Sequence, residues 1–162
     1  MHIGGSIWDM IKWRFLKRRL GLTKSEFKEL KDNPRNVEIV AKAPELMRKT
    51  IVAEVVSSHG CNSEHKIGDK LYFDGFGNLL TERCPKRVCC YAVSAVIPQI
   101  FAVNELFYAG VDPNEMRFKH AGCFDVGLAC GGIGRIAMKI SIEEVPKKPA
   151  KRPGRNPKGN PA

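Results

Sequence analysis

The chain has 162 residues, 43% of them hydrophobic, and a formal net charge of +10 at pH 7. This length suits one compact domain of roughly 100 residues with appendages and excludes two full hydrophobic cores. No stretch approaches the roughly 18 consecutive apolar residues of a membrane span, and basic residues interrupt the N-terminal apolar stretch where a signal peptide has an uncharged core. We therefore expect a cytoplasmic protein with no membrane span.

The positive charge lies at the two ends of the chain. Residues 1–49 hold 12 basic and 6 acidic side chains, residues 50–145 hold 9 and 11, and residues 146–162 hold 6 and none. We expect three parts: an N-terminal helical arm over 1–49, a cysteine-rich domain over 50–145 and a basic tail over 146–162. The tail has five prolines and almost no hydrophobic residue, so burial cannot offset the entropy of ordering it, and we predict that it is disordered.

The arm is expected to be helical. Between residues 6 and 20 apolar residues recur at helical spacing with basic residues between them, which predicts an amphipathic basic helix ended by Gly21. Thr23 and Glu26 form a capping box for a second short helix, which Asn33-Pro34 closes. Residues 35–49 are ambiguous, although Pro44 can open one more turn of helix. The resulting hairpin is rich in aromatic residues, which favour interfaces.

Strand signals begin the central domain. Residues 51–56 form a β-branched run typical of a buried strand, and residues 70–73 predict its neighbour after a Gly-Asp turn. A further turn leads into residues 79–81, and residues 135–142 alternate as a final strand. Together they predict a small antiparallel sheet.

One long helix is expected between these strands. Cys84-Pro85 suits its start, with the cysteine as N-cap and the proline at the first helical position, and Gly110 follows its end. Pro98 should kink or split it. The predicted fold class is α+β: a small antiparallel sheet packed against one long, proline-kinked helix, with an N-terminal helical hairpin and a disordered basic tail.

Six cysteines lie in three places in the central domain: Cys61 after the first strand, Cys84, Cys89 and Cys90 around the start of the long helix, and Cys123 and Cys130 before the last strand. Disulfides are rare in the cytoplasm, so thiols in this number indicate metal ligands or reactive groups. Loops at element boundaries can turn thiolates inward and leave backbone amides free to bond to sulfur. A helix beginning at Pro85 would also stabilise a thiolate at Cys84.

The spacing of the cysteines indicates which kind of metal centre they could bind. Cys84 and Cys89 form a C-x4-C pair and Cys123 and Cys130 a C-x6-C pair, whereas zinc ribbons use close C-x2-C pairs. Iron–sulfur clusters accept four thiolates from separated segments. We predict these four cysteines as ligands of an iron–sulfur cluster, with [4Fe–4S] as the first candidate and zinc as the alternative. Cys61 is a fifth candidate metal ligand.

Other interpretations stay open for single residues. Cys90 is expected to be a small buried hydrophobe. His59, His65 and His120 each lie within a few residues of a cysteine and could replace or orient a thiolate, although a loop histidine is usually a surface residue. Cys61 and His65 could instead be the nucleophile and base of a cysteine enzyme.

Residues 50–142 resemble a family of small, largely uncharacterised cysteine-containing proteins of anaerobic bacteria and archaea. The matching residues are Cys61, His65, the turn Lys66-Ile67-Gly68-Asp69, the cysteines from 84 to 90 with Pro98 downstream, and Cys130 before residues 136–142. The helical hairpin, the basic tail and extra cysteines, among them Cys123, depart from the short members. The resemblance implies the fold outline and an anaerobic setting, and it implies no activity.

Two functions follow from these features. The first is an iron–sulfur protein that serves as an electron-transfer or accessory subunit of an anaerobic enzyme complex and docks on a larger redox enzyme through its arm. The second is a structural-zinc module that binds nucleic acid through its basic ends. The second has less support, because the cysteine-rich domain is slightly acidic and lacks zinc-finger spacing. A non-catalytic role is expected in either case.

Overall fold

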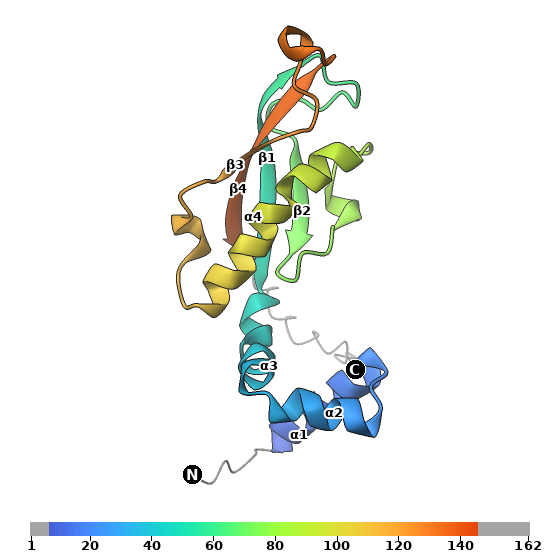
Figure 1. The fold of residues 1–162 in the computed structure, drawn as a ribbon, viewed down its shortest axis with the longest axis vertical. Helices are drawn as coiled ribbons and strands as arrows, with labels where there is room; N and C mark the ends of the chain where they lie inside the picture. Colours follow the sequence, from blue (N-terminus) through green and yellow to red (C-terminus); the bar gives the residue numbers. More distant parts are fainter. Residues whose placement is uncertain (1–6, 146–162) are drawn as a thin grey trace, which may run out of the picture.

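The computed structural model describes residues 7–145 and shows a four-stranded sheet with one long helix across it and a helical arm at one end (Figure 1). Within this range the helices are α1 (Ile7–Leu20), α2 (Lys24–Asp32), α3 (Pro34–Leu46) and α4 (Cys90–Tyr108), and the strands are β1 (Lys49–His59), β2 (Lys70–Asp74), β3 (His120–Gly122) and β4 (Arg135–Glu144). The predicted α+β class is confirmed. The tail predicted to be disordered, 146–162, lies outside the described residues.

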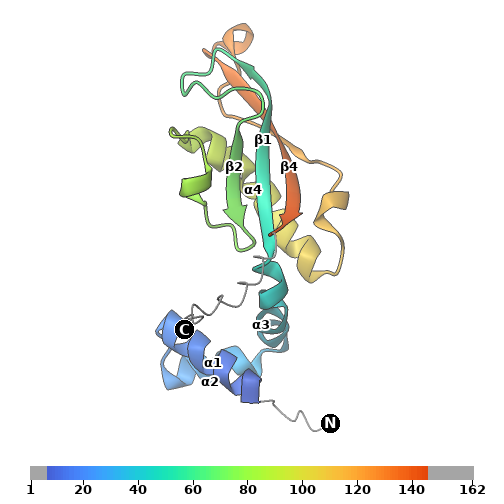
Figure 2. The ribbon, with the colours of Figure 1, turned by 180° about the vertical axis from the view of Figure 1, so that it is seen from behind.

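The sheet is antiparallel throughout, in the order β2-β1-β4-β3. β1 pairs with β4 along its whole length, from Lys49 opposite Glu144 to His59 opposite Arg135. A register shift at Val55 marks a bulge in β1, and bulges increase the local twist of a strand. Because β1 and β4 are longer than β2, the β1–β4 pair extends past β2, to the end of the sheet away from the arm (Figures 1 and 2).

The hydrophobic core lies between α4 and one face of the sheet. Alternate residues of β1 point to this face, as the period of a strand requires, and they meet one side of the helix. The buried cluster includes Ile51, Ala53 and Val55 from β1, Leu71 and Phe73 from β2, Met138 and Ile140 from β4, and Ala92, Val96, Ile100 and Val103 from α4. Figure 2 shows the other face, which α4 leaves uncovered. There Glu54 and Lys70 form an ion pair 3.4 Å long.

α4 differs from the expected helix in two ways. It begins at Cys90 with Cys89 as N-cap, because residues 84–89 continue the irregular chain after a 3-10 turn at Thr81–Arg83. It also continues through Pro98, which is exposed, so that solvent can reach the carbonyl that a proline leaves unpaired. The prediction that the helix starts at Pro85 is wrong, and Pro98 does not split it.

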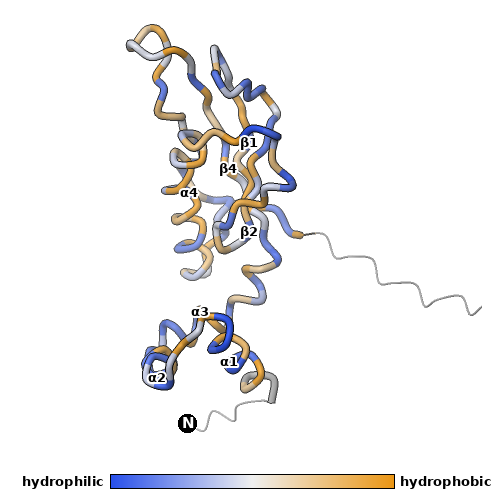
Figure 3. Tube along the Cα trace, turned by 90° about the vertical axis from the view of Figure 1, so that its right-hand side faces the viewer, coloured by the Kyte–Doolittle hydropathy of each residue, from blue (hydrophilic) through white to orange (hydrophobic). Residues whose placement is uncertain are grey.

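Within the described part of the chain, one helix, α4, is long and apolar enough to cross a membrane by length and composition alone. Its buried residues are Ala92, Val96, Ile100, Val103 and Phe107, and Figure 3 shows hydrophobic residues along both α4 and the strands that it faces. The core helix of a globular domain meets the same two criteria. On the outer side of α4, Tyr91, Ile97 and Phe101 are exposed.

The arm contains three helices where the sequence predicts two and an ambiguous stretch. The capping box of α2 is confirmed, since the N–H of Thr23 donates to the Glu26 carboxylate at 2.8 Å. Asn33 ends α2 and also caps α3, which has Pro34 as its first residue. α3 then runs without interruption to Leu46, directly before β1.

α1 packs on α2 through a different face from the one that the spacing predicts. The rings of Trp13 and Phe27 meet edge to face, with centroids 6.1 Å apart, and Leu16 of α1 is half-buried. Ile11 and Phe15, two of the apolar residues whose helical spacing predicts the amphipathic helix, are exposed. The arm therefore keeps exposed hydrophobic side chains, among them Ile11 and Phe15.

Candidate metal centre

Four chain segments meet at the end of the sheet away from the arm and form an open pocket of about 720 Å³. They are the loop after β1, the start of α4, the residues after β3 and the start of β4. The pocket is lined by four of the six cysteines, Cys61, Cys89, Cys90 and Cys123, and by His65. All six cysteines are free thiols. We call this cavity the thiol pocket.

Close contact between two glycines builds one wall of the thiol pocket. The β1–β4 register pairs His59 with Arg135, and the neighbouring residues Gly60 and Gly134 cross backbone against backbone. A Cβ atom at Gly134 would lie 2.0 Å from the carbonyl oxygen of Gly60 and 2.9 Å from the nitrogen of Cys61. Glycine is required for so close an approach, and the contact fixes where Cys61 leaves the strand.

Cys89 is the N-cap residue of α4, at the positive end of the helix dipole. Burial raises the pKa of its thiol, but the backbone N–H groups of Ala92 and Tyr91 and the side chain of Ser63 lower the pKa by more, so that it lies below its ordinary value. None of these groups closes a full capping hydrogen bond to the sulfur. The surroundings of Cys89 therefore favour its thiolate form more than those of an unperturbed cysteine do.

We expect Cys89 of the metal-free protein to react with iodoacetamide at lower pH than an unperturbed cysteine, because the thiolate is the nucleophile. Peptide mapping by mass spectrometry across a pH series measures the rate at each cysteine. Ser63→Ala removes one of the groups that lower the pKa and should move the reaction of Cys89 to higher pH. A pH profile for Cys89 that matches the denatured chain would contradict its thiolate character.

Cys123 and the glycine-rich loop form a second wall. The N–H of Ile136 in β4 donates to Cys123 Sγ at 3.3 Å. The carboxylate of Asp125 accepts backbone N–H groups across the loop, at 2.9 to 3.2 Å, and these bonds, led by that from Gly134, hold the pKa of Asp125 below its usual value. Asp125 therefore closes the loop around Cys123, and both of its carboxylate oxygens already accept hydrogen bonds from the backbone.

A tight turn from Cys61 to His65 supplies the third wall. The N–H of Glu64 donates to the carbonyl of Cys61 at 2.9 Å, and Glu64 has a φ of 61°, the one positive value outside glycine among the described residues. Such backbone strain concentrates at functional sites. Of the three candidate histidines, His65 lines the thiol pocket and is buried, whereas His59 and His120 are exposed.

Two of the predicted ligands, Cys84 and Cys130, lie outside the thiol pocket. Cys84 packs against β2, where its sulfur accepts the N–H of Tyr72 at 3.3 Å. Cys130 is exposed at the end of a 3-10 turn. Cys90 is exposed at the rim of the thiol pocket, so the expectation of a buried Cys90 is wrong. The three remaining thiols, Cys61, Cys89 and Cys123, are each half-buried against the core.

Among residues 7–145, no three His, Cys, Asp or Glu side chains are placed to hold a single metal ion. The thiols line a cavity instead of meeting at one point. Thiolate and imidazole are nevertheless the donors that zinc and iron–sulfur clusters use. The donor atoms of the thiol pocket are therefore of the kind that both zinc and iron–sulfur clusters use. The separation of these donors distinguishes a single zinc ion from a cluster.

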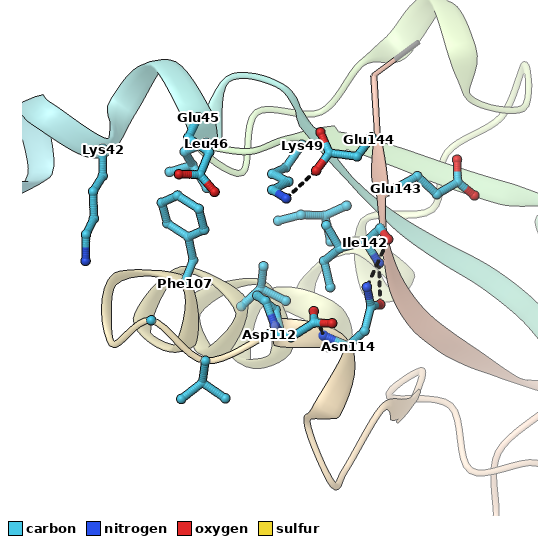
Figure 4. Close-up of a pocket in the computed structure, with 15 residues that line it drawn as sticks. Lys42, Glu45, Leu46, Lys49, Phe107, Asp112, Asn114, Ile142, Glu143 and Glu144 are labelled. Carbon is cyan, nitrogen blue, oxygen red and sulfur yellow. Dashed lines mark hydrogen bonds and ion pairs between the residues drawn. The ribbon is translucent and has the colours of Figure 1, made fainter.

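A second pocket, of 430 Å³, lies near the arm (Figure 4). Two of its lysines are already paired, Lys49 with Glu144 and Lys42 with Glu38. Asn114 exchanges hydrogen bonds in both directions with the backbone of β4. These contacts tie α3, α4 and β4 together, so we assign this pocket a structural role.

Compared with protein-family models, with curated proteins and with solved structures, the chain matches none of them. The resemblance to small cysteine-containing proteins of anaerobes stays a prediction. The thiol pocket is therefore the feature of this chain that points to a function.

Proposed function

We propose that the thiol pocket binds an iron–sulfur cluster and that the protein is an electron-transfer or accessory subunit of an anaerobic enzyme complex. The observation that carries this proposal is that Cys61, Cys89 and Cys123, far apart in the sequence, line one 720 Å³ pocket. The proposed ligand set differs from the one predicted from spacing, because Cys61 joins it and Cys84 and Cys130 leave it.

The separation of the thiols favours a cluster over a single zinc ion. Zinc lies about 2.3 Å from each sulfur of a tetrahedral site, which requires sulfurs within about 4 Å of one another. The described side chains are not gathered in this way, and a cavity lies between them. A cluster places several metal atoms between its ligands, so its thiolates surround a volume instead of a point.

The environment of the sulfurs also suits cluster ligands. Cys123 already accepts a backbone N–H from Ile136, and the start of α4 lowers the pKa of Cys89. Hydrogen bonds to ligand sulfurs help to set the reduction potential of a cluster. Both features support the thiolate form that a metal ligand requires.

The position of the thiol pocket suits exchange of electrons with another protein. A bound cluster would supply one-electron chemistry, with a reduced protein as donor and an oxidised protein as acceptor. The rings of Tyr91 and Phe124 meet edge to face at the pocket, 6.3 Å apart, and both are exposed. The arm lies at the other end of the sheet (Figure 1), where exposed Ile11 and Phe15 suit docking on a larger redox enzyme.

Protein purified without oxygen is expected to be brown and to contain iron and acid-labile sulfide in equal amounts. Chemical analysis of iron, sulfide and zinc, together with an absorbance spectrum, measures this directly. Colourless protein with one zinc per chain would contradict the cluster and support the alternative of a zinc module with basic ends. Colourless protein without metal would contradict both functions.

A further inference from the structure

α1 presents an exposed apolar strip that its packing on α2 does not use. Trp13, which meets Phe27 of α2, marks the packed side of the helix. At about 3.6 residues per turn, the positions of Ile11 and Phe15 lie on the opposite side. Ile11 is 52% exposed and Phe15 is 62% exposed. Residues four apart are neighbours on a helix, so Ile11 and Phe15 form one strip along the outer face, which we call the α1 strip.

Positively charged residues flank the α1 strip on both sides. By helical position Arg14 and Arg18 lie along one edge of the strip, and Arg19 lies along the other. All three are exposed, and no ion pair of the described residues includes them. Residues 10–22 contain no Asp or Glu. The outer face of α1 is therefore apolar along its middle and positively charged at its edges.

An open hollow of about 410 Å³ adjoins this charged face. It is lined by three basic residues and no acidic one: Arg14, Lys17 and Arg18, with Gly21 and Leu22. Arginine and lysine are the side chains that bind phosphate groups in proteins. Basic residues in the last turn also complement the helix dipole, which explains Lys17 and Arg18 but explains neither Arg14 nor the α1 strip. The hollow is therefore suited to a phosphate group.

We infer that the outer face of α1 binds the surface of a bilayer that contains anionic lipid. A lipid phosphate occupies the hollow, and Ile11 and Phe15 lie at the boundary of the acyl chains. Such a surface matches both properties of the face, because anionic headgroups attract the arginines and the acyl layer accepts the α1 strip. Nucleic acid also attracts basic residues, but its phosphates offer the strip no apolar partner.

This inference goes beyond the proposed function and does not depend on a cluster. A redox enzyme embedded in a membrane is surrounded by lipid headgroups, so contact of α1 with lipid is compatible with docking on such an enzyme. The two proposals can fail separately. Protein without iron that binds anionic vesicles would contradict the cluster alone, and protein with iron that does not bind them would contradict the lipid contact alone.

Sedimentation of the full chain with vesicles tests the inference directly. One set of vesicles contains phosphatidylcholine alone, and the other contains phosphatidylcholine and phosphatidylglycerol in equal parts. We expect binding to the mixed vesicles, little binding to phosphatidylcholine alone, and a loss of binding as salt screens the exposed charges. No binding to the mixed vesicles, or equal binding to both sets, would overturn the inference. So would a double-stranded oligonucleotide that binds more tightly than the mixed vesicles.

Substitutions on α1 separate the two parts of the contact. Arg14→Gln with Arg18→Gln should weaken binding to the mixed vesicles about fivefold for each residue, because a basic side chain near an anionic surface contributes about 1 kcal/mol. Ile11→Ser with Phe15→Ser should weaken it on the order of tenfold or more, because the buried apolar area is lost. Binding that is indifferent to Ile11→Ser with Phe15→Ser would overturn the bilayer as the partner and favour a polyanion without an apolar layer.

Two exposed basic residues outside the arm provide the matched control. Lys86→Gln with Arg117→Gln removes the same net charge as the arginine variant and should leave vesicle binding unchanged. Equal losses in the two double variants would show that net charge and not the face of α1 determines binding. Circular dichroism shows that each variant is folded, as the exposure of all the altered side chains leads us to expect.

Discussion

Cys89→Ser is expected to lose nearly all of its iron. Cys89 is the thiol whose pKa the start of α4 lowers, and it is half-buried at the thiol pocket. Loss of a supporting residue around a metal ligand typically weakens binding by roughly 10- to 100-fold, and loss of the ligand itself should weaken it further. Iron per chain after anaerobic reconstitution and desalting measures the effect, with circular dichroism to show that the variant is folded.

Two other cysteines provide matched controls for this variant. Cys130→Ser changes an exposed thiol outside the thiol pocket and should keep its full iron content. Cys84→Ser should also keep its iron, because a serine oxygen can accept the N–H of Tyr72 as the sulfur does. If both controls lose their iron together with Cys89→Ser, the ligands are the pairs predicted from spacing and not those of the thiol pocket.

Gly134→Ala is expected to destabilise the fold and to abolish iron binding. The added Cβ would lie 2.0 Å from the carbonyl oxygen of Gly60 and 2.9 Å from the nitrogen of Cys61. Both are backbone atoms, which cannot turn aside as a flexible side chain can, so the free energy of unfolding should fall by about 3 kcal/mol, at the upper end of the usual range for overpacking. Urea unfolding measures the stability, and iron analysis reports the displacement of Cys61.

Gly122→Ala is the matched control for Gly134→Ala. Gly122 lies in β3, and the nearest heavy atom to its added Cβ would be the carbonyl oxygen of Ile136 at 3.9 Å, an ordinary van der Waals contact. A compatible Gly→Ala change alters stability by about 1 kcal/mol at most. Equal destabilisation by the two substitutions would show that the backbone crossing at Gly134 has no special role.

The fold class could be predicted because local patterns decide it. The β-branched run over 51–56 gives the central strand, and the apolar stretch that follows Cys90 gives the core helix. The start of α4 could not be predicted, because Cys84-Pro85 satisfies the local preferences of a helix start as well as any other pair. Only the packing of Cys84 against β2 shows that the chain stays irregular until Cys89.

The candidate site depended more heavily on tertiary structure. Spacing along the chain singles out close pairs of cysteines, whereas convergence on one pocket depends on the β1–β4 register and on where α4 begins. Cys61 directly follows the crossing of Gly60 and Gly134, and Cys123 is bonded to the N–H of Ile136 two residues after it, so both cysteines line the thiol pocket. His65 looked equivalent to two other histidines in the sequence, and its burial distinguishes it. The one local signal for it was the Lys66–Asp69 turn that follows it directly.

Anomalous X-ray diffraction at the iron absorption edge, on crystals of protein purified without oxygen, tests the convergence of the thiols most directly. We expect one strong anomalous peak inside the thiol pocket, between Cys61, Cys89 and Cys123. A peak beside Cys84 or Cys130, or an empty pocket with those three side chains turned away from one another, would contradict it.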